Sequence, residues 1–139
     1  MKPVLLDTGV IVALLDRSER FHKRSKEAIE ALETSPLVTC EAVIAESCYL
    51  LRRIAGAPET VLDNVAHGLF QIPFELSRSA PEVRRLLHKY RDRPADLADV
   101  CLIHLAGQLG TGEILTLDRA FVFYRWGRNK RFRLLVPLD

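Results

Sequence analysis

The chain has 139 residues, of which 48% are hydrophobic and 27% charged, and its formal net charge is +2. This composition is typical of one globular domain and argues against a disordered chain. No apolar stretch approaches the roughly 18 residues of a membrane span, and the apolar start lacks a charged leader and cleavage site. We therefore expect residues 1–139 to form a single cytoplasmic domain with no contact to a membrane.

Strands and helices are predicted to alternate along the chain. In chain order we expect a strand at 3–6, helices at 8–18 and 21–33, a strand at 37–40, helices at 41–55 and 58–67, a strand at 69–76, helices at 79–92 and 94–110, a strand at 113–117, a short helix from Asp118 and a strand at 132–138. Pro73 places the third strand at an edge. Ser79 and Glu82, with Pro81 between them, predict a capping box at the start of the fifth helix. The alternation predicts an α/β fold with a mostly parallel sheet covered on both faces.

Four acids are placed where such a fold would bring them together. Asp7 directly follows the first predicted strand and Asp118 the fourth, so both should project from the same edge of a parallel sheet. Glu46 and Asp99 interrupt apolar faces of helices, on the sides expected to pack inward. Carboxylates in such positions need partners.

Each acid also has a purely structural explanation to be weighed. Asp7 and Asp118 could cap the helices that they precede. Asp96 falls in a first helical turn, where the helix dipole favours an acid. No basic residue lies within one helical turn of Asp99 or Glu46, however, and several unpaired acids at one sheet edge would raise one another's pKa. A hard divalent cation such as Mg²⁺ would relieve this repulsion and could assist hydrolysis of a phosphodiester.

Basic residues gather in two stretches. Residues 119–133 include six basic side chains and no acid, and the basic residues of 17–26 are interrupted only by Glu19. Either stretch could be a solvated face, but beside an acidic cleft both would suit a phosphate backbone. The candidates for phosphate contacts are Arg119, Arg17 and Arg20.

The cysteines and histidines give little indication of a site. Cys40, Cys48 and Cys101 are odd in number and show no CxxC spacing, so we expect core residues without a disulfide framework or zinc. His104 lies five residues after Asp99 and should point away from it, and no histidine is assigned to catalysis.

Four segments in order, "LLDTGVIVALLD", "AVIAESCYLL", "DLADVCLIHLAGQLG" and "ILTLDRAF", resemble the PIN-domain family, and most closely the VapC-type toxins of bacterial toxin–antitoxin pairs. The resemblance runs from the first predicted strand to the last. It implies a three-layer α/β/α sandwich and a Mg²⁺- or Mn²⁺-dependent endoribonuclease. It also implies a homodimer held inactive by a cognate VapB-type antitoxin whose tail enters the acidic groove.

The same resemblance assigns roles to individual residues. The catalytic, metal-binding acids of the family fall on Asp7, Glu46, Asp99 and Asp118, with Asp96 as an additional candidate of the "DLAD" subset. Thr8 and Thr116 match positions where a hydroxyl can orient a carboxylate or a water. Ala120 departs from the family, since many relatives have a polar or acidic residue there.

The sequence therefore leads to the hypothesis that a metal-activated water cuts RNA, leaving a 5′-phosphate and a 3′-hydroxyl. One alternative is a non-catalytic or RNA-processing module of the same fold whose acidic groove binds a basic partner. Another is an aspartyl-phosphate phosphatase, but such enzymes use a "DxD" pair after the first strand and this chain has "DTG".

Overall fold

The computed structural model describes residues 2–139 of the chain. Its elements in chain order are β1 (Val4–Leu6), α1 (Thr8–Leu15), α2 (His22–Ala31), β2 (Leu37–Val38), α3 (Glu41–Leu50), α4 (Ala57–Ala66), β3 (Phe70–Gln71), α5 (Leu76–Lys89), α6 (Leu97–Leu109), β4 (Glu113–Leu115), the 3₁₀ helix η1 (Arg119–Val122), β5 (Arg125–Trp126), β6 (Lys130–Arg131) and β7 (Arg133–Leu134).

A five-stranded parallel sheet forms the centre of the molecule, with strand order β3-β2-β1-β4-β7. The chain proceeds from β1 outward through β2 to β3, and then crosses back to place β4 on the other side of β1. Strand order therefore reverses between β1 and β4, the position at which open α/β sheets form ligand crevices. β1 is buried on both faces, as its unbroken apolar sequence predicts for a central parallel strand.

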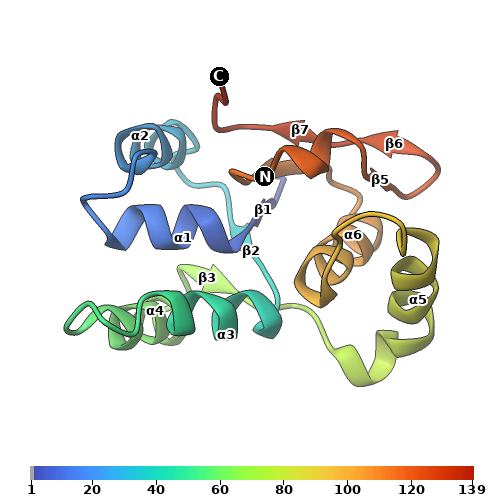
Figure 1. Ribbon diagram of the computed structural model, residues 1–139, viewed down its shortest axis with the longest axis horizontal. Helices are drawn as coiled ribbons and strands as arrows, with labels where there is room; N and C mark the ends of the chain where they lie inside the picture. Colours follow the sequence, from blue (N-terminus) through green and yellow to red (C-terminus); the bar gives the residue numbers. More distant parts are fainter. Residues whose placement is uncertain (1) are drawn as a thin grey trace.

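Helices cover the sheet on both sides, which confirms the predicted α/β sandwich. In Figure 1, α1 and α2 lie to the left of β1, α3 and α4 lie below it, and α5 and α6 lie to its right. α5 packs on α6, and α1 packs on both α2 and α3. No helix within residues 2–139 has the length and apolarity to cross a membrane.

The start of α5 differs from the prediction. The helix begins at Leu76, three residues before the predicted capping box, and its N-cap Glu75 makes no side-chain capping hydrogen bond. Pro81 consequently lies inside the helix, where proline removes a backbone hydrogen bond and bends the axis. Figure 1 shows the first turns of α5 set at an angle to the rest. The prediction of a capping box at Ser79 and Glu82 was therefore wrong.

The strands are shorter than predicted, and one pair was missed. β3 ends at Gln71, before Pro73, and lies at the sheet edge as expected. The antiparallel hairpin β5–β6 occupies part of a stretch that we left unassigned. Its connection has positive φ angles at Gly127 and Asn129, of 55° and 59°, which are the residue types that tolerate this conformation. With strands of two residues, the alternation pattern is too short to detect.

The cysteines lie where we expected. All three are free, with Cys40 and Cys101 buried and Cys48 packed partly buried against the same core.

Gly112 is required by close packing. A Cβ at this position would overlap the indole of Trp126, whose Nε1 donates a hydrogen bond of 3.1 Å to the carbonyl of Arg131. Gly112→Ala should therefore push the β5–β6 hairpin away and lower the free energy of unfolding by about 1–3 kcal/mol, measured by urea denaturation. Gly107→Ala is the matched control, since its Cβ would meet nothing closer than 3.7 Å. An equal loss in both variants would contradict this account.

Candidate active site

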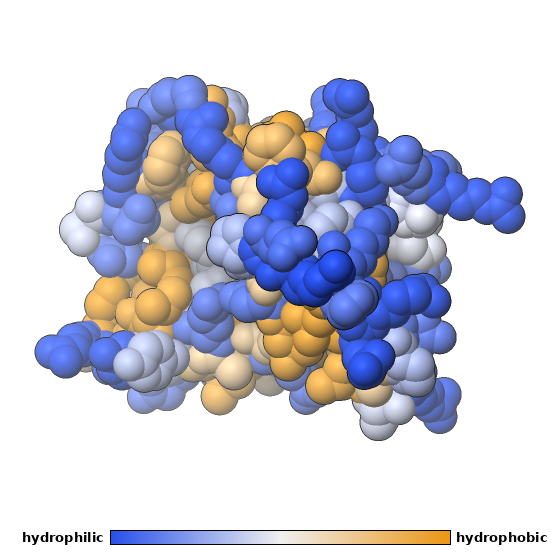
Figure 2. Space-filling view, turned by 45° about the vertical axis from the view of Figure 1, so that its right-hand side comes forward, coloured by the Kyte–Doolittle hydropathy of each residue, from blue (hydrophilic) through white to orange (hydrophobic). Residues whose placement is uncertain are grey.

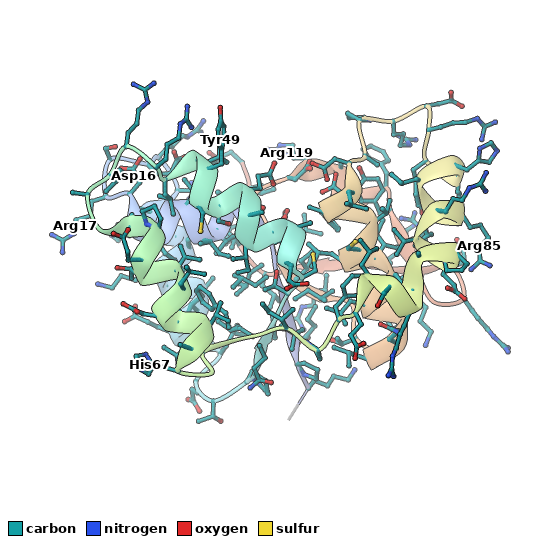
Figure 3. All side chains as sticks on the ribbon, turned by 90° about the horizontal axis from the view of Figure 1, so that it is seen from below. Asp16, Arg17, Tyr49, His67, Arg85 and Arg119 are labelled. Atoms are coloured by element: carbon teal, nitrogen blue, oxygen red, sulfur yellow. The ribbon has the colours of Figure 1, made fainter. Side chains whose placement is uncertain are left out.

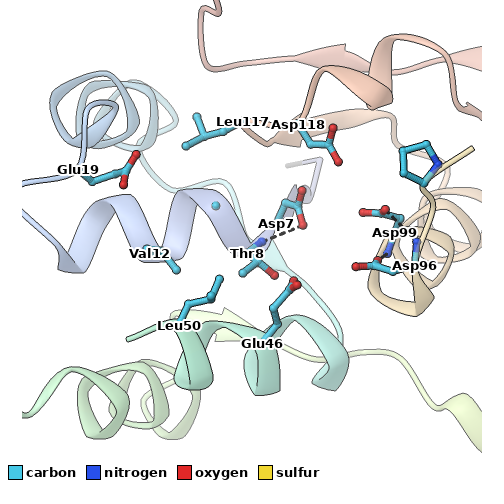
Figure 4. A pocket seen from close by; sticks show the side chains of 12 residues that line it. Asp7, Thr8, Val12, Glu19, Glu46, Leu50, Asp96, Asp99, Leu117 and Asp118 are labelled. Carbon is cyan, nitrogen blue, oxygen red and sulfur yellow. Dashed lines mark hydrogen bonds between the residues drawn. The ribbon is translucent and has the colours of Figure 1, made fainter. Parts of the chain in front are cut away.

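A cavity of 390 Å³ opens at the carboxyl ends of β1 and β4, where the strand order reverses. Figure 4 shows carboxylates around it that come from β1, α3, the start of α6 and the end of β4. Its lining residues are Asp7, Thr8, Gly9, Val12, Glu19, Glu46, Leu50, Pro94, Asp96, Asp99, Leu117 and Asp118. The structure thus brings together all five acids that the sequence singled out.

Asp7 is the most firmly held of these acids. It follows β1, caps the N-terminus of α1, and is 6% exposed. Its Oδ1 accepts a hydrogen bond of 2.8 Å from the Thr8 backbone N–H, and its Oδ2 accepts one of 2.7 Å from the Thr116 hydroxyl. Both carboxylate oxygens are therefore oriented by the ends of β1 and β4.

Thr116 connects the two strand-end acids. Thr116 directly follows β4 and is fully buried. It does not itself line the cavity. Its hydroxyl donates to Asp7 and accepts a hydrogen bond of 3.0 Å from the Asp118 backbone N–H. Asp118 is exposed, and its Oδ1 accepts a hydrogen bond of 2.9 Å from the Ala120 N–H as it caps η1. The predicted orienting role of Thr116 agrees with these contacts.

Asp99 and Asp96 form the capping box of α6. The Asp99 N–H donates a hydrogen bond of 2.9 Å to Asp96 Oδ1, and the Asp96 N–H donates one of 3.2 Å to Asp99 Oδ2. Asp99 is 7% exposed, whereas Asp96 is exposed. The sequence predicted a helix from residue 94, with Asp99 in its interior. Because α6 begins at Leu97, Asp99 is instead fixed in the first helical turn.

Glu46 reaches the cavity from α3 as an exposed side chain. The expectation that it faces the core was wrong: Val43, Ile44 and Ser47 form the buried face of α3. Glu46 instead points across the cavity toward Asp7 and Asp99 (Figure 4).

Thr8 contributes differently from Thr116. Its backbone N–H holds Asp7, but its hydroxyl oxygen is buried and has no hydrogen-bond partner within residues 2–139. Thr8 is 5% exposed and lines the cavity. Buried hydroxyls are normally paired, so this one is available to a ligand in the cavity.

Comparison with known proteins identifies the fold family. The family model described as PIN domain matches residues 4–127. The chain belongs to the PIN domain family. This PIN domain is 30% identical over 118 residues to Ribonuclease VapC26 of Mycobacterium tuberculosis, covering 84% of this chain and 87% of that protein. The crystal structure of Mycobacterium tuberculosis VapC20, a sarcin–ricin loop cleaving toxin, matches with a TM-score of 0.74 at 16% identity, over 83% of this chain and 89% of that one.

Burial and mutual repulsion disfavour the ionised acids of this PIN domain. Burial raises the pKa of Asp7 to about 6, although its hydrogen bonds from Thr116 and Thr8 oppose the change. Burial also raises the pKa of Asp99, and the negative charges of Asp96, Asp7 and Asp118 add to this effect. Within the described residues, no Lys, Arg or His forms an ion pair with any of the five acids. The cavity lacks a cation of its own.

The donor chemistry of the cavity fits a hard divalent cation. The donors are carboxylate oxygens, supplemented by the unpaired Thr8 hydroxyl, and these are the ligands that Mg²⁺ and Mn²⁺ prefer. As the side chains stand in residues 2–139, however, no three His, Cys, Asp or Glu groups form a ready-made metal cluster. The acids surround the cavity instead of converging on one point.

Glu19 also lines the cavity, although nothing in the sequence marks it as a site residue. It follows α1 in a turn and lies at the far end of the cavity from Asp99 (Figure 4). In the sequence, Glu19 only interrupts the basic residues of 17–26. Helix and strand periodicity carries no information about a residue in a turn. Only the path of the chain after α1 brings it to the cavity.

None of the three arginines proposed for phosphate contacts lines the acidic cavity. Arg119 follows Asp118 and lies between the two helical halves, whereas Arg17 lies at the left edge of the molecule (Figure 3). Arg20 is 2.8 Å from Asp139, an exposed ion pair that occupies its guanidinium. The structure thus leaves Arg119 as the candidate nearest to the acids.

Proposed function

We propose that this PIN domain is a divalent-cation-dependent endoribonuclease, acting as the toxin of a VapBC-type pair. The observation that carries the proposal is the cavity at the β1–β4 switch point, which six carboxylates line, those of the five predicted acids and of Glu19, with no basic ion-pair partner within residues 2–139. The 30% identity to Ribonuclease VapC26 supports RNA as the substrate class.

The acids that would hold Mg²⁺ or Mn²⁺ are Asp7, Glu46, Asp99 and Asp118, with Asp96 as an additional candidate. When bound, such an ion supplies Lewis-acid activation of water and charge stabilisation at the phosphate. In the reaction, water adds to phosphorus and the bond to the 3′ oxygen breaks, leaving a 5′-phosphate and a 3′-hydroxyl.

The protein's own contribution is positioning. Thr116 and the Thr8 N–H fix the Asp7 carboxylate, and the capping box with Asp96 fixes Asp99. The unpaired Thr8 hydroxyl can donate to a phosphate oxygen. Without a cation these carboxylates would repel the RNA backbone, so the same residues should make both binding and cleavage depend on the metal.

The partners follow from the same proposal. We propose a homodimer and a VapB-type antitoxin that brings a basic group to the acidic cavity, since the cavity lacks one of its own. Co-purification with the product of a neighbouring short gene, followed by measurement of the complex mass by light scattering, would check both.

Purified protein is expected to cut RNA in the presence of Mg²⁺ or Mn²⁺ and to stop when EDTA is added. Sequencing of the RNA ends should show 5′-phosphates and 3′-hydroxyls. If the protein binds RNA or the antitoxin but shows no metal-dependent cleavage, it is instead a binding module of the same fold. Cleavage that persists in EDTA with 2′,3′-cyclic phosphate ends would contradict the proposed chemistry.

A further inference from the structure

A second cavity, of 450 Å³, lies between α5, α6 and the start of β5. Three cations line this basic groove, Arg85, Lys89 and Arg125, and no acid lines it. None of the three forms an ion pair within residues 2–139. His104 also lines the groove. The nearby carboxylate of Glu82, which does not line it, acts to raise the pKa of His104. The groove therefore carries a net positive charge, because three cations line it and Glu82 offsets only one of them.

The groove is shaped by a fixed guanidinium and two glycines. Arg125 Nη1 donates hydrogen bonds of 2.9–3.0 Å to the carbonyls of Val122, at the end of η1, and of Phe123 and Tyr124 after it, so its side chain is held in place. Gly107 of α6 and Gly127 of the hairpin both line the groove, and a Cβ on Gly107 would lie 3.7 Å from the Gly127 nitrogen. Without side chains at these two positions, a ligand can approach the backbone closely.

The basic groove and the acidic cavity are built on the same segments. Asp99 of α6 lines the cavity. Ile103 and Gly107 line the groove, and they follow Asp99 by four and eight residues on the same side of the helix. Eight residues of helix span about 12 Å, a distance that a few nucleotides cover. The chain also runs from Asp118 in the cavity through η1 to Arg125 in the groove.

An aromatic residue and a cation lie between the two sites. Along the chain, Arg93 follows Lys89 of the groove and directly precedes Pro94 of the cavity. Its guanidinium lies 4.7 Å from the ring centroid of Phe123. Phe123 itself is 55% exposed and is the C-cap residue of η1, five residues after Asp118 of the acidic cavity. Exposed aromatic and guanidinium groups are the surfaces on which unstacked RNA bases rest.

The surrounding face is hydrophilic. Figure 2 brings the half with α5, α6 and the β5–β6 hairpin forward and shows mostly polar surface there. Figure 3 shows Arg85 on the outer side of α5, at the opposite end of the molecule from Arg17.

We infer that the basic groove binds the backbone of single-stranded RNA a few nucleotides from the phosphate that is cut, with the strand crossing the Arg93–Phe123 pair on its way from the acidic cavity. The inference rests on the proposed function, because it places a further part of the same substrate. The basic residues that grip RNA are then Arg85 and Lys89 rather than the predicted Arg17 and Arg20.

Binding of a fluorescein-labelled single-stranded RNA of about 16 nucleotides tests this, by anisotropy with proteins that keep all the cavity acids, in Ca²⁺, which binds carboxylate oxygens in place of Mg²⁺. A denaturing gel of the same samples checks that the RNA stays uncut. Arg85→Gln/Lys89→Gln should weaken binding about 10-fold at 0.1 M salt and lower the slope of log K against log salt by about 1.4, or about 0.7 for each lost phosphate contact. Gln108→Glu, which adds one negative charge to the groove, should weaken binding as well, and Gln108→Lys should strengthen it.

Arg84→Gln/Lys23→Gln is the matched control, because it removes the same charge from exposed positions outside the groove. Its RNA affinity and salt slope should change little, and the melting temperatures of all variants should agree. If both double variants weaken binding equally, the groove has no specific role and only bulk charge matters. If the wild-type protein neither binds nor cuts RNA, the proposed function itself fails. These two failures are therefore distinguishable.

Discussion

Asp7→Asn and Asp99→Asn are each expected to lower the rate of RNA cleavage by about 100-fold or more, since even residues that only support metal ligands contribute 10- to 100-fold. The amide keeps the size of the carboxylate but not its charge, so cation binding in the cavity should be lost. Both carboxylates are buried and oriented by hydrogen bonds, from Thr8 and Thr116 to Asp7 and from the Asp96 N–H to Asp99 Oδ2, so another acid cannot take either position. Rates of cleavage at saturating Mg²⁺ provide the measurement.

Two further variants give this series its controls. Asp92→Asn removes an exposed acid from the loop before α6 that does not line the cavity, so cleavage should remain at the wild-type rate. Asp96→Asn keeps an N-cap residue of equal quality, so a loss limited to a few-fold would assign Asp96 to capping, and a 100-fold loss to the metal site. Full activity in Asp7→Asn or Asp99→Asn would contradict the assignment.

The strand-end acids could be predicted because their placement follows from topology alone. In a parallel sheet the residues after each strand share one edge, so Asp7 and Asp118 had to meet once β1 and β4 were adjacent. The structure adds the Thr116 hydroxyl that joins them, a contact across 109 residues of sequence. The resemblance pointed to that threonine, but the spacing of the residues by itself could not.

Other parts of the site depend on geometry that periodicity does not encode. Glu46 interrupts an apolar run, which suggested burial, yet one face of α3 borders an open cavity instead of the core. Glu19 arrives through a turn after α1. The basic groove joins Arg85 of α5 to Arg125 of a hairpin too short to show alternation. In each case tertiary packing, and not local sequence preference, decides where the side chain lies.

Metal-free protein is expected to lose stability as the pH rises from about 4 to above 6, with Asp7 as a main cause. Burial raises the pKa of Asp7 from 3.8 to about 6 in the folded state. Between these values the folded chain binds more protons at this site than the unfolded chain, so the free energy of unfolding falls as pH increases. The loss is complete above pH 6 and amounts to about 3 kcal/mol. The raised pKa of Asp99 extends the decline to higher pH.

Asp7→Asn should remove much of this decline. At pH 7.5 in EDTA, the variant should melt about 10 °C above the wild type, because no buried charge remains at position 7. Its amide oxygen can still accept from the Thr8 N–H, and its NH₂ group can donate to the Thr116 hydroxyl, so the local structure should persist. Below pH 4 the two proteins should have similar melting temperatures, since the wild-type carboxyl is then protonated in both states.

Divalent cations should reverse the order of stability. A cation bound by the ionised acids stabilises the folded state by about 4.1 kcal/mol at a thousand times its dissociation constant, which exceeds the roughly 3 kcal/mol lost at Asp7. Mg²⁺ or Mn²⁺ at pH 7.5 should therefore raise the melting temperature of the wild type and leave that of Asp7→Asn almost unchanged, whereas Asp92→Asn should respond like the wild type. Equal stabilisation of all three proteins would place the cation elsewhere on the surface. A lower melting temperature for Asp7→Asn in EDTA would show that the Asp7 carboxylate stabilises the fold through its two hydrogen bonds more than its burial costs.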